Sequence, residues 1–242
     1  MAADQTNGTQ PPSPSGCIAA ILTWNDPASC LATVHALQTH VTGIDHIVIY
    51  DNGSIDPFAL FAPVTNVDRI TIVRGPTNLG AGGGVTRLMQ ATLIYDPKTI
   101  LYIEDDFVCR RPLALAPLLA LLARDPFIGR IALGERGRRP KPAYFTFGAP
   151  PNETAQAAAQ VDLPVLHDAA LGDYQRLRLG WSNYPCVIPA VVARRYLLSG
   201  WTETRCAKEF YADGWETISL LPGHFTQIRA HHRLRAVPDW RY

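Results

Sequence analysis

The sequence of 242 residues lacks the segments that mark membrane-spanning and secreted proteins. Its longest apolar run, Leu113 to Ala123, is about eleven residues long and contains Pro117, whereas a helix needs ~20 apolar residues to cross a bilayer. The N-terminus has no basic segment followed by an apolar one, so nothing reads as a secretory signal. We therefore expect no transmembrane segment and a cytoplasmic protein.

The sequence also lacks an excess of charge and any paired cysteines. Its 22 Lys and Arg against 21 Asp and Glu give a formal net charge of +1, so no global field attracts nucleic acid or anionic lipid. The five cysteines include no C-x-x-C pair, which argues against a zinc or redox site. We expect no nucleic-acid partner, and we expect reduced, mostly buried thiols.

What the sequence does contain is enough apolar surface for a sizeable core. Hydrophobic residues make up 47% of the chain and charged residues 18%, which is typical of a compact globular protein. Residues 1–16 differ, because they are polar, rich in Pro, Ser and Gly, and have no hydrophobic period. We expect a disordered tail over 1–16 and a single domain over 17–242.

Apolar, β-branched runs alternate with segments of helical spacing. The pattern predicts strands over 17–23, 46–50, 69–73, 99–103 and 128–133, with helices after 26 and over 85–95 and 113–124. It weakens over 134–180 and then predicts helices over 189–198 and 215–221 and a last strand over 226–230. This alternation indicates an α/β fold with a mostly parallel, Rossmann-like central sheet and helices on both faces. Ligands of such sheets bind at the carboxyl ends of the strands.

Three consecutive carboxylates, Glu104-Asp105-Asp106, directly follow the apolar strand TILYI. Such neighbours repel one another and lose solvation unless a cation neutralises them. Carboxylate oxygens suit Mg²⁺ or Mn²⁺, which complete their shells with water and phosphate oxygens. The triplet therefore predicts a divalent metal site, with a solvated acidic turn as the alternative.

A glycine-rich segment, Asn78 to Gly84, stands between an expected strand and an expected helix. Its backbone N–H groups can approach a phosphate or ribose closely. A Rossmann fingerprint would need a glycine where Val85 stands, and a P-loop would need Lys there, followed by Ser or Thr. Both of those readings are disfavoured.

Four motifs occur in order over residues 17–110: Thr23-Trp24-Asn25, Asp51-Asn52-Gly53-Ser54-x-Asp56, Asn78-x-Gly80 with Arg87, and Glu104-Asp105-Asp106. Together they resemble the motifs of the family-2 nucleotide-sugar glycosyltransferases, whose fold is called GT-A. Thr23-Trp24-Asn25 is similar to the family's Thr-Tyr-Asn after the first strand. Asp51-Asn52-Gly53-Ser54-x-Asp56 is similar to its Asp-Asn-x-Ser-x-Asp after the second. Asn78-x-Gly80 with Arg87 resembles its third motif, and Glu104-Asp105-Asp106 its DXD-type metal motif, with Glu104 where many members carry Asp.

The resemblance implies roles for these residues. Residues 17–133 would form the nucleotide-sugar-binding half and 134–242 the acceptor-binding half. The resemblance implies that the donor nucleotide contacts Thr23, Asn25, Asp51, Asn78, Gly80, Arg87 and Asp105. It implies that Mn²⁺ or Mg²⁺ is held by Glu104 and Asp106, with His231 as a further metal or diphosphate contact.

The C-terminal half matches the family less well. There an acidic pair at the start of a late helix supplies the base that deprotonates the acceptor hydroxyl, and no such pair is present here. Glu209 and Asp213, ahead of the expected helix at 215–221, are the candidates for this base, with Glu216 third. The loop around Trp181 and Asn183 resembles one that contacts acceptor sugars.

The function implied is metal-dependent transfer of a hexosyl or deoxyhexosyl group, with inversion, from a nucleoside-diphosphate sugar to a glycan or lipid-linked acceptor, as in polysaccharide biosynthesis. The basic run at 136–141 leaves open a peripheral contact at the inner face of a membrane. A sugar-phosphate nucleotidyltransferase is one alternative, but it would need a Gly-, Arg- and Lys-containing loop where Thr23 to Pro27 stand. The other alternative is a non-catalytic nucleotide-sugar or glycan-binding module, which only an activity test separates.

Overall fold

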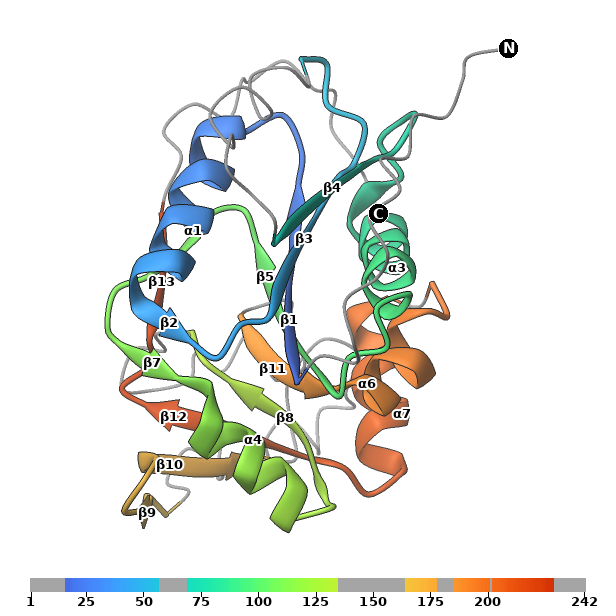
Figure 1. Cartoon of the computed structure of the whole chain (residues 1–242). Helices are drawn as coiled ribbons and strands as arrows, with labels where there is room; N and C mark the ends of the chain where they lie inside the picture. The colour runs from blue at the N-terminus through green and yellow to red at the C-terminus, as the bar shows by residue number, and fades with distance from the viewer. Residues whose placement is uncertain (1–15, 57–68, 135–163, 178–184, 201, 229–242) are drawn as a thin grey trace.

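The computed structural model describes residues 16–56, 69–134, 164–177, 185–200 and 202–228. A nine-stranded sheet runs through this part of the chain in the order β4-β3-β1-β5-β11-β8-β12-β10-β9 (Figure 1). Its strands are β1 (Cys17–Thr23), β3 (His46–Asp51), β4 (Ile70–Arg74), β5 (Thr99–Glu104), β8 (Ile128–Ala132), β9 (Leu166–Asp168), β10 (Gly172–Leu177), β11 (Cys186–Pro189) and β12 (Glu216–Leu221). Short strands outside it are β2 (Val41–Thr42), β6 (Phe107–Cys109), β7 (Leu113–Ala114) and β13 (Phe225–Gln227). The helices are α1 (Pro27–His40), α3 (Gly80–Leu93), α4 (Leu115–Arg124), α6 (Ala190–Val192), the π-helical η3 (Ala193–Leu197) and α7 (Glu203–Ala212).

Parallel pairing brings the ends of the first strands to one level. β1 pairs in parallel with β3 and with β5, and β3 pairs in parallel with β4. In this register Thr23 lies opposite Asp51, and Leu22 lies opposite Glu104. The polar residues that follow these strands therefore gather at one edge of the sheet.

Two strands run against the others. β11 pairs antiparallel with both β5 and β8, and β10 pairs antiparallel with β12 and β9, whereas β12 and β8 are parallel. The expected α/β fold with a mostly parallel sheet is thus confirmed, with β11 inserted at its centre.

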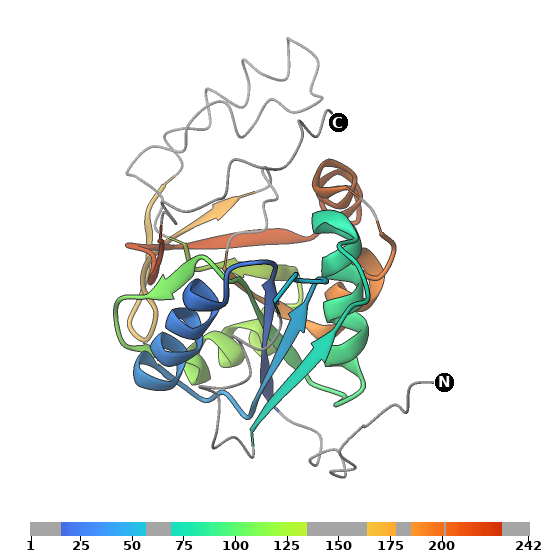
Figure 2. The same cartoon turned by 90° about the horizontal axis from the view of Figure 1, so that it is seen from above.

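Helices cover both faces of the sheet. In Figures 1 and 2, α1 and α4 lie on one side, and α3, α6 and α7 lie on the other. Alternate residues of β1 enter the two cores, Ala19 and Ile21 on one face, Ile18 and Ala20 on the other, and all four are fully buried. Burial on both faces explains why these strands are apolar almost without a break.

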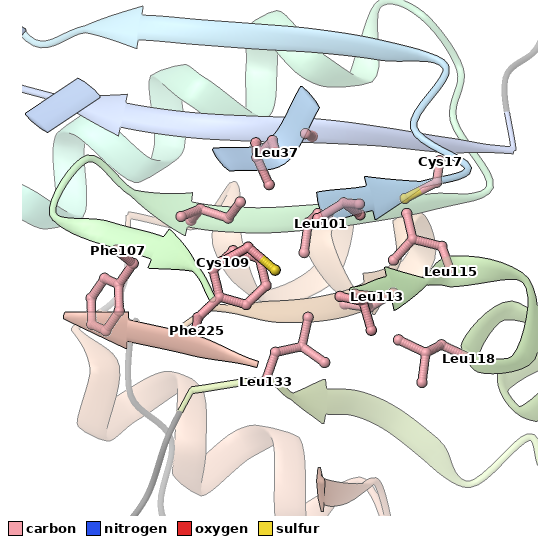
Figure 3. Packing of buried hydrophobic residues seen from close by; sticks show 14 of the residues in the cluster. Cys17, Leu37, Leu101, Phe107, Cys109, Leu113, Leu115, Leu118, Leu133 and Phe225 are labelled. Atoms are coloured by element: carbon pink, nitrogen blue, oxygen red, sulfur yellow. The ribbon is translucent and has the colours of Figure 1, made fainter. Parts of the chain in front are cut away.

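The hydrophobic core under α1 and α4 includes residues from both the N-terminal and the C-terminal parts of the described chain. Figure 3 shows Leu37 of α1, Leu101 of β5 and Phe225 of β13 in this cluster, and all three are fully buried. All five cysteines are buried and free, as expected. Among the described residues no helix is both long and apolar enough to span a membrane.

The expectations for the C-terminal part need correction. The segment expected as a helix over 215–221 is strand β12, whose residues from Thr217 to Leu220 are buried between β8 and β10. The last strand is β13, which pairs with β6 and not with the main sheet. The helix expected over 189–198 forms as α6 followed by η3.

Candidate functional site

The carboxyl ends of β1, β3 and β5 hold the centre of the candidate site. The Thr23 hydroxyl donates to Asp105 Oδ2 at 2.7 Å, and the Trp24 backbone N–H donates to the same oxygen at 3.2 Å. The Asn52 backbone N–H donates to the Thr23 carbonyl at 2.9 Å. The structure therefore brings three of the four sequence motifs into direct contact, with Asp105 fixed across the end of β1.

Asp51 ends β3 with a fully buried side chain. Its Oδ1 accepts from the Ser54 hydroxyl and, at 2.9 Å, from the Ser54 backbone N–H. Its Oδ2 accepts no hydrogen bond from the described residues and lies 3.9 Å from Arg74 Nε. The Arg74 guanidinium also donates to the Ser54 carbonyl at 2.9 Å. A hydrogen-bond acceptor and a cationic donor therefore stand side by side at this end of the site.

Sequence reasoning missed Arg74, although a signal was present. Arg74 is the last residue of β4, so it occupies the same edge position on its strand as Asp51 does on β3, its neighbour in the register. The signal in the sequence was a charged residue at the end of an apolar strand, because the other strand ends of this kind hold the residues of the candidate site.

Asn25 joins the loops that follow β1 and β3. Its backbone N–H donates to the Ser54 hydroxyl at 2.8 Å, and its side-chain oxygen accepts from the Ile55 N–H at 2.8 Å. Asn25 has a positive φ of 53°, a conformation that Asn tolerates better than most residues. In this structure Asn25 shapes the site through its loop.

Asn52 connects the same edge to the glycine-rich segment. Its amide donates to Asn78 Oδ1 at 2.9 Å and to the Gly80 carbonyl at 3.1 Å, and its Oδ1 accepts from the Leu79 N–H at 3.1 Å. Gly80, with a positive φ of 71°, opens α3. Asn78 and Gly80 are therefore held against the strand ends, as the fourth motif in this cluster. Arg87 lies exposed further along α3, where it donates to Gln90 Oε1 at 3.1 Å.

Burial and mutual repulsion dominate the electrostatics of the acidic triplet. Loss of solvation, then the charges of Asp106, Glu203 and Asp105, raise the pKa of Glu104 to about 8. Loss of solvation also raises the pKa of Asp105 to about 7, against the hydrogen bonds that it accepts. The Tyr102 hydroxyl, two residues earlier on β5, donates to Glu104 Oε1 at 3.4 Å. A cation at this position would offset both the lost solvation and the repulsion, which raise the pKa values of Glu104 and Asp105.

The donor set suits a hard divalent cation that the protein binds through few groups. The described residues contain no cluster of three or more His, Cys, Asp or Glu side chains arranged for a metal. Mg²⁺ and similar ions are commonly held by one or two carboxylates, with water and substrate phosphates filling the other positions. The carboxylates of Glu104 and Asp106 fit that mode of binding.

Asp106 accepts hydrogen bonds from Gln227 and Ile228, the last two described residues. Gln227 Nε2 donates to Asp106 Oδ2 at 2.6 Å, and the Ile228 N–H donates to the Asp106 carbonyl at 2.6 Å. Asp106 itself is 8% exposed. His231, Trp181 and Asn183, which were expected to contact metal or acceptor, lie outside the described residues.

The late acidic residues are placed differently from expectation. Glu209 lies near the end of α7 and Asp213 just after it, so neither precedes a helix. Asp213 is bound by the Tyr196 hydroxyl and, at 2.7 Å, by the Arg195 guanidinium. Glu216, the third candidate, begins β12 and pairs with Arg176 at 2.7 Å.

Glu203, which sequence reasoning missed, begins α7 and acts electrostatically on Glu104. The charge of Glu203 acts on Glu104, so the first turn of α7 lies near the acidic triplet, and Asp213 lies at the other end of the helix. At a rise of about 1.5 Å per residue, roughly 15 Å of helix separate Glu203 from Asp213. The sequence signal was Thr202, a helix-capping residue, directly followed by an acidic residue.

Comparisons with known proteins show the fold. No protein-family model and no curated protein matches the sequence. Among solved structures, the mannosyltransferase PcManGT from Pyrobaculum calidifontis, in complex with GDP-Man and Mn²⁺, matches with a TM-score of 0.57 and 13% identity over 92% of this chain and 59% of that one. TarS 1-349 of S. aureus matches with a TM-score of 0.57 and 11% identity over 88% of this chain and 60% of that one. GalNAc-T7 with UDP, GalNAc and Mn²⁺ matches with a TM-score of 0.65 and 12% identity over 94% of this chain and 45% of that one.

These likenesses cover nearly all of this chain but only about half of each neighbour. At 11–13% identity they establish a shared architecture. The chain has the GT-A fold of nucleotide-sugar glycosyltransferases, as its motifs indicated; assignment to family 2 rests on those motifs alone.

Proposed function

We propose that the chain is a metal-dependent glycosyltransferase that moves a hexosyl or deoxyhexosyl group from a nucleoside-diphosphate sugar to a hydroxyl of a glycan or lipid-linked acceptor. The observation that carries this proposal is the convergence of Asp51, Asp105 and the flanking carboxylates at one edge of a GT-A sheet. The complexes of PcManGT with GDP-Man and Mn²⁺ and of GalNAc-T7 with UDP, GalNAc and Mn²⁺ support it. A role in polysaccharide biosynthesis, in the cytoplasm or at the inner face of a membrane, belongs to the same proposal.

The donor base would bind between Asp51 and Arg74. Asp51 Oδ2 can accept a hydrogen bond, and the adjacent guanidinium can donate one. Uracil, thymine and guanine present such an edge, an N–H beside a carbonyl, whereas cytosine and adenine do not. Asp105, held by Thr23, would bind the ribose. Asn25, Asn78, Gly80 and Arg87 would line the rest of the nucleotide site.

Glu104 and Asp106 would hold Mn²⁺ or Mg²⁺. When bound, the ion supplies positive charge that stabilises the diphosphate as a leaving group. His231 would be a further ligand or diphosphate contact, as the resemblance to the family implies. The acidic residues thereby bind and orient the reactive end of the donor.

Glu203 would be the base of a single displacement with inversion. Its carboxylate would accept the proton of the acceptor hydroxyl while that oxygen forms a bond to the anomeric carbon and the bond to the diphosphate breaks. Its place at the start of α7, near Glu104, supports this role better than the positions of Glu209 and Asp213. Trp181 and Asn183 would contact the acceptor.

A thermal-shift panel tests the donor site without an acceptor. UDP, GDP, TDP and CDP are each added with and without Mn²⁺ or Mg²⁺. A ligand at about 100 times its dissociation constant stabilises the folded state by roughly 2.7 kcal/mol. We expect a metal-dependent rise for UDP, TDP or GDP and none for CDP, and Asp51→Asn should remove it. No rise with any nucleotide would contradict the proposal.

The base is tested by comparing three matched variants. Glu203→Gln should keep donor affinity and lose about 10²-fold or more of transfer, because the amide cannot accept the proton. Glu209→Gln and Asp213→Asn should retain most activity. If either of them loses transfer and Glu203→Gln does not, the base role returns to that residue. Donor binding without transfer to any acceptor would favour the binding module.

A further inference from the structure

The two-stranded ribbon formed by β6 and β13 fixes one side chain against the acidic triplet. β6 begins directly after Asp106 and pairs antiparallel with β13, with Gln227 opposite Phe107. β13 is anchored by Phe225, which is fully buried and whose N–H donates to the Leu133 carbonyl at 3.0 Å. The backbone that carries Gln227 is therefore held by the core and by two other segments.

The Gln227 side-chain amide contacts the carboxylate of Asp106. Its Nε2 donates to Asp106 Oδ2 at 2.6 Å, and the next residue's N–H donates to the Asp106 carbonyl at 2.6 Å. One contact orients the carboxylate and the other positions the backbone beneath it. Both contacts restrain the side of the Asp106 carboxylate that carries Oδ2.

We propose that Gln227 is a positioning residue for the metal site, an inference that rests on the proposed function. By holding Oδ2, its amide fixes the rotation of the Asp106 carboxylate and so the place of the oxygen offered to the cation. A neutral donor does this without adding charge to a cluster that already repels itself. Partners of this kind usually contribute 10–100-fold to metal affinity.

Two substitutions test the inference, with a control of the same chemistry elsewhere. Gln227→Met removes the amide and keeps the chain length, and Gln227→Ala removes the amide without adding apolar surface. Gln227 is exposed at the end of its strand, so the fold does not depend on its side chain. Gln38→Met makes the same change at an exposed residue of α1. Asp106→Asn tests the metal site itself.

The measurement is the dissociation constant of Mn²⁺ for the full chain, from the electron paramagnetic resonance signal of free Mn²⁺, alone and with UDP or GDP. We expect Gln227→Met and Gln227→Ala to weaken Mn²⁺ binding by about 10–100-fold, with melting temperatures near wild type. Gln38→Met should bind like wild type. A merely structural role for Gln227 would lower the melting temperature and leave the affinity of the folded protein unchanged.

The outcomes separate the inference from the proposed function. If Asp106→Asn abolishes Mn²⁺ binding while both Gln227 variants bind within twofold of wild type, the positioning role is wrong and the metal site stands. If the wild-type chain binds no Mn²⁺ with either nucleotide, the result contradicts both the positioning role of Gln227 and the proposed metal-dependent function.

Discussion

At the scale of single residues, the site is organised by buried polar side chains that bind the backbone of other loops. Asn52 is the clearest case, since it is 3% exposed and contacts both the segment before α3 and the end of β1. A buried amide with several partners costs more to remove than one surface hydrogen bond.

Asn52→Asp should therefore weaken both the fold and donor binding. The carboxylate cannot donate, so its oxygens would face Asn78 Oδ1 and the Gly80 carbonyl. We expect a loss of about 1–3 kcal/mol in the free energy of unfolding. Calorimetric titration with the nucleotide that stabilises wild type should also show weaker binding. Thr77→Ala, at an exposed residue of the same segment, is the control. Equal binding by Asn52→Asp would remove this residue from the donor site.

Two histidines with little solvent exposure should contribute to the pH dependence of stability. Burial lowers the pKa of His46 and of His224 below the ordinary value of 6.5. The unfolded chain then binds these protons more readily, so their contribution to stability is complete above about pH 6.5 and is lost as the pH falls below that value towards the lowered pKa of the folded state. Glu104 and Asp105, whose pKa values are raised, act in the opposite direction over this range, so the histidine contribution is measured as a difference between wild type and a histidine variant between pH 7.5 and 5.5.

His46→Gln isolates one of these contributions. The His46 ring stacks on Tyr95 and contacts the Thr71 hydroxyl at 2.9 Å. A glutamine keeps a polar group there but does not titrate, so the melting temperature of wild type should fall relative to that of the variant as the pH falls from 7.5 to 5.5. A difference between the two proteins that does not change with pH would show that His46 does not contribute to the pH dependence of stability.

The residues predicted from sequence and those missed differ in how they reach the site. Asp51 ends β3 and Asp105 follows β5, the two parallel strands that flank β1, so a rule about strand ends finds them. Glu203 and Gln227 arrive from segments about a hundred residues later. The capping residue Thr202 marks the start of α7, but the place of α7 in the fold and the pairing of β6 with β13 depend on tertiary contacts that no local pattern in the sequence specifies.

At the scale of elements, the approach of α3 to the strand ends depends on a glycine. A Cβ at Gly84 would stand 2.9 Å from Asn52 Nδ2 and 3.0 Å from Leu22 Cδ1. The lack of a side chain at Gly84 therefore allows the helix to approach the strand ends at this position.

Gly84→Ala should destabilise the protein despite the better helix propensity of alanine. Overpacking of this kind costs about 1–3 kcal/mol, and propensity returns at most about 1 kcal/mol. Chemical denaturation measures the difference. The loss should be smaller in an Asn52→Ala background, where one of the two contacts is gone. Additive losses would show that the two residues act independently.

The elements themselves were predicted well where both faces are buried and poorly where segments are short. β1, β3 and β5 were recognised because apolar runs with polar ends are typical of central parallel strands. β12 was mistaken for a helix because a short apolar run does not distinguish a helix from a buried strand. The antiparallel direction of β11 depends on tertiary pairing and has no local signal.

At the scale of the whole molecule, one sheet joins the two halves of the chain. β11, β12, β10 and β9 come from the second half and extend the sheet begun by β1, β3, β4 and β5. Each half therefore lacks a complete core without the other. We expect a single unfolding transition.

That expectation is checked by following urea unfolding with far-ultraviolet circular dichroism and with tryptophan fluorescence. Trp24 lies beside the candidate site and Trp215 packs against Phe210 under α7, so the fluorescence reports on both halves. Coincident curves would support one cooperative unit. Separate midpoints would show that the nucleotide-binding half unfolds independently.

The place of β11 also affects how the chain is made. β5 ends at residue 104, but the strand that covers its free edge begins at Cys186. At a synthesis rate of ~5–20 residues per second, several seconds pass between the synthesis of β5 and that of β11. During this time the backbone N–H and C=O groups on the edge of β5 that faces away from β1 lack the strand that pairs with them in the folded protein. Such an edge is a template for pairing with other chains. The nascent protein is therefore most prone to aggregate, and most in need of a chaperone, between the emergence of β5 and that of β11.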